Sequence, residues 1–222
     1  MNSYTPTQRT KVRRLSKRAV YDKTLVHGIL DEGFLCHLGF AVDGLPYVIP
    51  TLYARSGDRL FLHGSGASRT LKTLSQGVDV CATITLVDGY VLARSAFHHS
   101  MNYRSVVVLG RAHLVTELEE RLEALRTLTN HLVPHRWEEL REPNDLELKQ
   151  TMVLTLPLKE VSAKVRTGPP VDEEEDYAAP VWAGVVPIIT QIGEAIPDGR
   201  LLPNAKSLEP SRFAAAQKRS GT

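Results

Sequence analysis

The chain has 222 residues, 42% of them apolar, and a formal net charge of +2. This length suffices for one well-buried domain with extensions, and so small a net charge gives no argument for nucleic acid or a membrane surface as a partner. No apolar run approaches the roughly 20 residues of a membrane-spanning helix. The basic N-terminus lacks the apolar core of a secretory signal, and Cys36 and Cys81, without a CxxC spacing, predict buried thiols in a reducing compartment. We therefore expect a cytoplasmic protein.

The first 20 residues carry six basic side chains and no interleaved run of aromatic ones. They predict a basic N-terminal arm that is solvated or folded over an anionic site; nucleic-acid binding is the least favoured alternative, because no aromatic residues interleave the basic ones. Residues 21–32 predict a helix, because Asp22 is a typical N-cap and Leu25, Ile29 and Leu30 would share one face. Gly33 would end that helix.

Three strands are predicted next, over residues 34–42, 47–54 and 59–63. Asp43-Gly44 is a dipeptide typical of a tight hairpin turn between the first two. Pro50 lies inside the second strand and removes one ladder donor, so we expect an edge or a bulge there. Irregularities of this kind often lie beside functional sites.

Residues 63–72, HGSGASRTLK, precede a helix predicted over about 67–75. Glycines allow backbone N–H groups to approach an anion, a helix N-terminus favours negative charge, and Arg69 adds a forked cationic donor. The segment therefore predicts a phosphate site, although it lacks the GxxxxGK[ST] spacing of a P-loop. The alternative is a solvent-exposed loop that is capped by Ser68.

The central part of the chain predicts more strands, over residues 78–86, 90–95 and 105–115, with Asp88-Gly89 as a turn between the first two. Five or six antiparallel strands with short connections predict a small closed barrel. A helix over 117–131, a long strand over about 151–164, and a loose tail from about Leu201 complete the pattern.

A polar cluster, AFHHSMNYRS, lies between two of these strands. His98 and His99 are candidate catalytic residues, because imidazole titrates near neutral pH. A strand would turn them to opposite faces, and with no carboxylate nearby we expect no metal site. Haem ligation and a purely structural hydrogen bond remain open for them. Tyr103, Arg104 and Ser105 form a second candidate anion-binding group, and with Arg69 they would suit a phosphate monoester such as that of FMN.

Three segments together resemble the pyridoxamine 5′-phosphate oxidase-like superfamily: FLCHLGFAVDGLPYVIPTLY, RLFLHGSGASRTLKTL and VCATITLVDGYVLARSAFHHSMNYRSVVVLGRA. The resemblance covers roughly residues 9–165 and is strongest to the flavin-nucleotide-binding branch that includes the nitroimidazole-resistance proteins. It implies a split β-barrel of about six antiparallel strands with flanking helices, a homodimer, and FMN at the dimer interface. In that family the matching residues contact the ring (Ile49, Pro50, Thr51, Leu52), wrap the phosphate (His63, Ser68, Arg69) and close the pocket (Tyr103, Arg104, Ser105).

The chain departs from the pyridoxamine phosphate oxidases themselves. It has IPTLYA where they carry an Arg-x-x-Leu-Leu-Lys strand, and no Arg-x-His motif follows Trp182. This argues against vitamin B6 oxidation. We expect an FMN-dependent oxidoreductase acting on a small organic substrate, with a basic arm over 1–20, a barrel domain over 21–166 and an extension over 167–222. The alternatives are a non-catalytic binder of flavin, haem or deazaflavin on the same barrel, and a barrel that has lost its cofactor.

Overall fold

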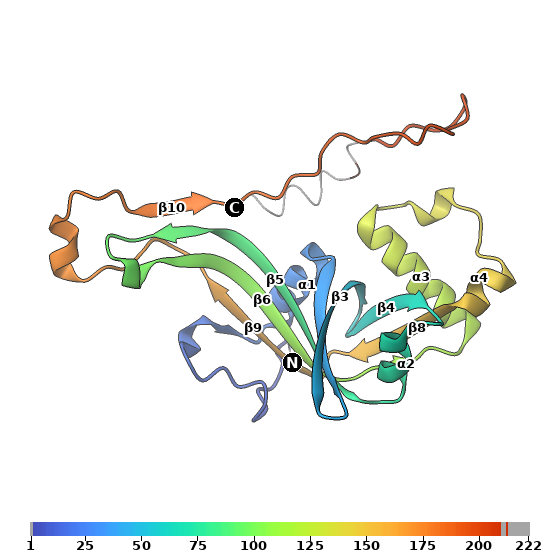
Figure 1. Cartoon of the computed structure of the whole chain (residues 1–222), viewed down its shortest axis with the longest axis horizontal. Coiled ribbons are helices and arrows are strands. Elements are labelled where there is room, and N and C mark those ends of the chain that lie inside the picture. The colour runs from blue at the N-terminus through green and yellow to red at the C-terminus, as the bar shows by residue number, and fades with distance from the viewer. Residues whose placement is uncertain (1, 210–211, 213–222) are drawn as a thin grey trace.

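A single antiparallel sheet, curled into a split β-barrel with helices on its flanks, forms the centre of the computed structural model (Figure 1). The structure describes residues 2–209 and residue 212. Within them the sheet has ten strands in the order β1-β9-β6-β5-β2-β3-β4-β8-β7, and β10 pairs with β5 outside this path. The expected fold class is confirmed, but the strands outnumber the six or so that we expected.

The elements of the described chain have the following bounds. The strands are β1 (Ala19–Val20), β2 (Leu35–Val42), β3 (Leu45–Ser56), β4 (Arg59–Ser65), β5 (Asp79–Leu92), β6 (Ser100–Arg111), β7 (His113–Leu114), β8 (Thr151–Pro157), β9 (Glu160–Arg166) and β10 (Gly184–Pro187). The α-helices are α1 (Lys23–Glu32), α2 (Arg69–Ser75), α3 (Leu118–Leu132) and α4 (Asp145–Gln150), and short 3-10 turns are η1 (Ser16–Arg18), η2 (Ala96–His98), η3 (Trp137–Glu139) and η4 (Glu174–Ala178).

The first helix and hairpin follow the local signals of the sequence. The Asp22 carboxylate accepts the Leu25 N–H at 3.0 Å and so caps α1, as predicted. Asp43 and Gly44 both have positive φ angles, 51° and 78°, which a two-residue hairpin turn of this hand requires. β2 and β3 consequently pair along their whole common length.

The long β5–β6 hairpin overturns one predicted turn. Asp88-Gly89 does not reverse the chain, because β5 continues to Leu92 with a register shift between Val87 and Gly89. A Cβ at Gly89 would lie 2.9 Å from the Val186 carbonyl oxygen, so the glycine makes room for β10 at this irregularity. The single strand expected over 151–164 is likewise two strands, β8 and β9.

Two buried clusters hold the barrel and its helices together. The larger fills the barrel, where Val26 and Leu30 of α1 pack against Tyr53 and Ile84 of the sheet. The smaller lies between α3 and the far side of β3, β4 and β8 and contains Ala54, Phe61, Val115, Ala124, Leu128 and Val153. No helix in the described part of the chain is long and apolar enough to cross a membrane.

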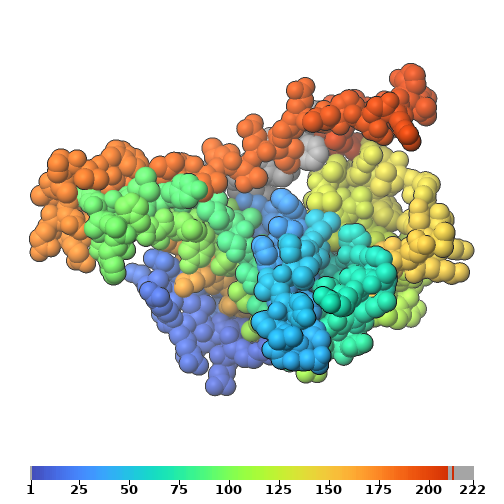
Figure 2. Space-filling model, in the orientation of Figure 1, coloured from blue at the N-terminus to red at the C-terminus, as the bar shows by residue number. Residues whose placement is uncertain are grey.

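The segments directly before and after the barrel in the sequence pack against it. The Tyr4 N–H donates to the Tyr21 carbonyl at 2.8 Å, and β1 pairs with β9. After β9, the fully buried Asp172 carboxylate accepts the Arg94 backbone N–H at 2.9 Å and its guanidinium at 3.0 Å. Beyond β10 the chain runs on as an extended segment along one side of the molecule (Figure 2).

Candidate functional site

The strand β3 has one edge that pairs with no strand over most of its length. β2 pairs with β3 along residues 45–52, whereas β4 pairs with it only from Tyr53 to Ser56. In the described part of the chain, the β4-facing edge of residues 45–52 therefore has no strand partner. Its backbone groups are available to a ligand in the way that any sheet edge is.

Strand periodicity tells which residues of β3 present their backbone at this open edge. The Tyr53 N–H donates to the Phe34 carbonyl of the β2 side at 3.2 Å, so alternate residues from Tyr53 backwards turn toward β2. Pro46, Val48 and Pro50 therefore face the open edge. The two prolines have no N–H, which makes the Val48 N–H the donor between them and confirms the prediction that Pro50 marks an edge.

The side chains of the predicted ring-binding residues divide between two faces. Val48 and Pro50 are exposed on the outer face of the sheet, whereas Ile49 and Thr51 alternate with them and turn toward the barrel side. Leu52, in register with Leu35 of β2, shares the outer face with Pro50. A flat ring at this edge would therefore meet the side chains of Pro50 and Leu52 and the backbone of Pro50 and Leu52, because the N–H and C=O groups of Ile49 and Thr51 point toward β2.

The loop between β4 and α2 uses its backbone donors within the protein. The Gly66 N–H donates to the Gln150 carbonyl at 2.7 Å, the Ala67 N–H to Ser65 Oγ at 3.2 Å, and the Ser68 N–H to the Ser65 carbonyl at 2.9 Å. A Cβ at Gly66 would lie 3.3 Å from the Gln150 carbonyl oxygen, so this glycine serves close packing. An anion here would therefore be recognised mainly by side chains, and Ser68 itself caps α2.

Arg69 is a cationic side chain that this region leaves available, as Lys72 of the same helix is. It is exposed in the first turn of α2, and no described carboxylate forms an ion pair with it. Its guanidinium lies over the ring of Tyr47, 5.6 Å from the centroid. Figure 2 shows the β2–β3 hairpin and α2 side by side on one face of the molecule. No local pattern in the sequence points to Tyr47, because its contact with Arg69 depends on where α2 docks.

His63, at the end of β4 that leads into the loop, carries an unsatisfied polar atom. Its Nδ1 is buried and has no hydrogen-bond partner in the described structure. Burial lowers the pKa of this imidazole below its usual value. His63 pairs with Val153 of β8. It follows Leu62, the register partner of Tyr53, so it lies across from Leu52, on the same face and just beyond the last β3–β4 pair.

Arg104 is not free to bind a phosphate in this arrangement. Its guanidinium donates to Glu32 at 2.8 Å and to Asp88 at 2.7 Å, and these two carboxylates raise the pKa of Arg104. Strand alternation also turns it to the opposite face of β6 from Tyr103 and Ser105. The chain by itself therefore does not offer the Arg104 guanidinium to the two-arginine pocket that we predicted, because Glu32 and Asp88 accept its N–H donors.

The two adjacent histidines lie at the far end of the β5–β6 hairpin, away from β3 and α2 (Figure 1). His98 Nε2 is 3.5 Å from Glu173 Oε1, and His99 Nδ1 is 2.9 Å from the Ser95 carbonyl oxygen. The expectation that no carboxylate lies near them was wrong, because the C-terminal extension folds back and brings Glu173 to His98. Within one chain they are remote from the open edge of β3.

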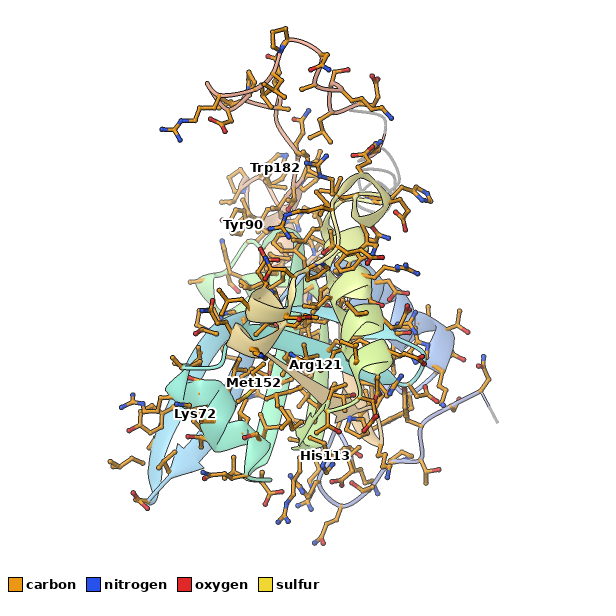
Figure 3. All side chains as sticks on the ribbon, turned by 90° about the vertical axis from the view of Figure 1, so that its right-hand side faces the viewer. Lys72, Tyr90, His113, Arg121, Met152 and Trp182 are labelled. Carbon is orange, nitrogen blue, oxygen red and sulfur yellow. The ribbon has the colours of Figure 1, made fainter. Side chains whose placement is uncertain are left out.

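A separate hollow of about 400 Å³ lies where α3, α4, β7 and β8 meet, around Arg121 and Met152 (Figure 3). Arg121 Nη2 donates to the carbonyl oxygens of Leu148 and Thr151, the latter at 3.0 Å. This arginine of α3 therefore holds that helix against the junction of α4 and β8, so the polar groups around the hollow are engaged in holding the fold together.

Residues 22–165 match the family model described as pyridoxamine 5′-phosphate oxidase. The chain belongs to this family. The search among curated proteins found no match. The family assignment confirms the resemblance drawn from the sequence, and the matched region ends within β9 and so leaves out the C-terminal extension.

Three solved structures of the family's fold are similar to this chain. The flavocytochrome Anf3 from Azotobacter vinelandii is 45% identical, with a TM-score of 0.87 over 93% of this chain and 96% of its own. The FAD and heme binding protein from Mycobacterium smegmatis is 33% identical, with a TM-score of 0.83 over 87% and 95%. A proposed 5-nitroimidazole antibiotic resistance protein from Bacteroides thetaiotaomicron shares the fold at 24% identity, with a TM-score of 0.56 over 66% and 86%.

Proposed function

We propose that this protein binds a flavin nucleotide and passes electrons or hydride between it and a small organic substrate. The observation that carries the proposal is the similarity to the flavocytochrome, 45% identical over nearly the full length of both chains. The open edge of β3 and the free guanidinium of Arg69 support it independently. When bound, a flavin supplies the redox chemistry, and the protein supplies binding, orientation and electrostatics.

The residues beside β3 have the chemistry that a flavin nucleotide needs. The Val48 N–H and the neighbouring carbonyl groups would hydrogen-bond the polar edge of the ring, while Pro50 and Leu52 offer apolar contact to its face. Arg69 would neutralise the phosphate through its forked N–H donors. Ser68 would act by fixing the start of α2, and the neutral imidazole of His63 would border the same face.

FMN is the nucleotide that we propose, and FAD is the variant that the Mycobacterium smegmatis protein's description names. Both carry the ribityl phosphate that Arg69 would meet, so the residues described above serve either one. Heat release of the bound chromophore, followed by chromatography against both standards, distinguishes them. If the protein releases FAD alone, the bound nucleotide is FAD and the proposal of FMN is wrong.

A second copy of the chain would complete the site in this proposal. The outer sheet face around β3 is exposed and apolar, with Leu35 45% and Val48 64% exposed, and such a face favours association. Tyr103 and Ser105 lie on the outer face of β6 and would close the pocket from the partner. Size-exclusion chromatography with light scattering should give a dimer, and a monomer with bound flavin would remove this part of the proposal.

The primary test is the visible spectrum of the purified protein. We expect flavin absorbance in the blue, or its appearance after addition of FMN. Arg69→Ala should weaken FMN binding about 30-fold, since a hydrogen bond to a charged group is worth about 2 kcal/mol. Arg111→Ala is the matched control, because Arg111 is exposed and, among the described residues, pairs only with exposed Asp79. A colourless protein that binds no added flavin contradicts the proposal.

His98 and His99 are proposed to act on the substrate and not on the flavin. They lie in and next to η2, in the turn between β5 and β6, which is remote from β3 within one chain (Figure 1), so this role requires the partner's site. His98→Ala and His99→Ala should both leave flavin affinity unchanged. At least one of them should lower turnover, and that variant identifies the histidine that acts on the substrate. Equal turnover by both variants and the unaltered protein would assign the pair to structure.

Haem binding is the second candidate, and the two descriptions that name a flavocytochrome and a heme binding protein favour it. Histidine imidazole is a common axial ligand. His37 and His63 are the candidates, because His37 pairs with Pro50 and His63 lies next to Leu52, so both border the proposed flavin strand. Reconstitution with haem should give a Soret band that His37→Ala or His63→Ala shifts. An identical Soret band in both variants excludes these ligands.

A further inference from the structure

We propose that Tyr47 is a positioning residue that makes the site selective for a phosphorylated flavin, by holding the guanidinium of Arg69 extended toward the phosphate. This inference rests on the proposed function. It concerns the stack formed by Phe40, Tyr47 and Arg69, which brings together β2, β3 and α2.

The stack has a fixed base. Phe40 and Tyr47 are register partners on β2 and β3, and their rings lie 5.6 Å apart at an interplanar angle of 16°. Phe40 is itself packed against the barrel core. Two strands and the core therefore fix the plane of the Tyr47 ring, and a flat ring held in this way is a rigid support for a planar guanidinium.

Close packing of α2 brings Arg69 to that ring. Gly64 lies below α2, and a Cβ there would come within 2.9 Å of Leu71 Cδ1. Leu71 and Leu74 are buried in the barrel core, so α2 rests directly on the sheet. The first turn of the helix then places Arg69 with its guanidinium 5.6 Å from the Tyr47 centroid, which is within the range of cation–π attraction.

This contact leaves the donors of Arg69 unused within the described part of the chain. A ring face attracts a guanidinium without accepting its N–H groups in the plane, so the fork stays available to a phosphate. A long side chain that is already held in one orientation loses less freedom when the anion binds. Tyr47 would thereby favour flavins that carry a phosphate over riboflavin, which lacks one.

The test is the ratio of FMN affinity to riboflavin affinity, measured by quenching of flavin fluorescence. Tyr47→Ala should lower this ratio about fivefold, in line with a cation–π contact, and Tyr47→Leu should do the same while keeping apolar bulk. Tyr47→Phe should preserve the ratio, because it keeps the ring face. Arg69→Ala gives the reference loss, and thermal unfolding checks that each variant is folded.

The outcomes separate this inference from the function on which it rests. Unchanged ratios in Tyr47→Ala and Tyr47→Leu, or an equal loss in Tyr47→Phe, would overturn the role of the ring while leaving flavin binding intact. Equal weakening of FMN and riboflavin would assign Tyr47 to packing. An unaltered protein that binds neither flavin would overturn the proposed function, and this inference with it.

Discussion

Two arginines that the sequence placed in one phosphate pocket have opposite surroundings in the structure. Arg104 is surrounded by the carboxylates of Glu32 and Asp88, whereas Arg69 lies on an aromatic ring and keeps its donors free. The charge of Arg104 is neutralised by two carboxylates within the protein, and this ion-pair cluster stabilises the fold. The charge of Arg69 has no such carboxylate among the described residues and can be neutralised by a bound anion. Residue type alone does not tell a ligand-binding arginine from a structural one; the neighbours that use its N–H groups do.

The largest expected effect comes from removing Arg104 from its ion pairs with Glu32 and Asp88. Arg104→Ala leaves two half-buried carboxylates without their cation, and we expect a loss of about 2 kcal/mol in the free energy of unfolding, below the loss for a fully buried pair. Arg69→Ala should change it by less than about 0.5 kcal/mol, as an exposed substitution does. Urea denaturation of both variants measures the difference. Equal losses would show that the two arginines are alike in their effect on folding.

A smaller effect is expected from a change in the packing of α2, which places Arg69. Gly64→Ala forces Leu71 to shift, and we expect about 1 kcal/mol of destabilisation from overpacking together with a lower FMN-to-riboflavin affinity ratio. Gly110→Ala is the control, because a Cβ there meets only Leu156 Cδ1 at an ordinary 3.4 Å. Calorimetry and flavin titration follow the two quantities. A stability loss with an unchanged ratio would separate α2 docking from phosphate recognition.

The smallest expected effect is the pH dependence from His63, which like Arg69 has unused hydrogen-bonding capacity. Burial lowers the pKa of His63 in the folded state, so below the ordinary histidine pKa the unfolded chain binds the proton more readily. Stability should therefore fall as the pH drops from 7.5 to 5.5. His63→Leu should reduce this slope, and His27, whose pKa burial also lowers, should supply the remainder. Urea midpoints of both proteins at the two pH values measure this pH dependence. A steeper slope in His63→Leu would contradict the attribution of the slope to His63.

Local signals predicted the parts of the fold that depend on few neighbours. The Asp22 cap and the Asp43-Gly44 turn are decided within a few residues, and the structure has both. Asp88-Gly89 has the same turn composition but lies in a continuous strand, because β10, nearly a hundred residues later, pairs with that part of β5. A dipeptide preference does not outweigh a sheet that a distant strand completes.

The same holds for the candidate site: features of single residues were predictable, and contacts between distant residues were not. The edge character of Pro50 and the exposure of Arg69 follow from the chemistry of single residues. The partners of Arg104 and His98 do not, because Glu32 and Glu173 are separated from them by 72 and 75 positions in the sequence. Tyr47 was missed for a related reason, since its ring meets Arg69 only after α2 has docked on the barrel.

The alternation of Pro46, Val48 and Pro50 along the open edge of β3 has a consequence for solubility. An unpaired strand edge can form backbone hydrogen bonds with a strand of another chain, and repeated addition of strands in this way leads to aggregation. Proline at every second edge position interrupts the hydrogen-bond ladder that such a chain would need. The edge can thus satisfy a few polar atoms of a small flat molecule while remaining a poor template for another polypeptide.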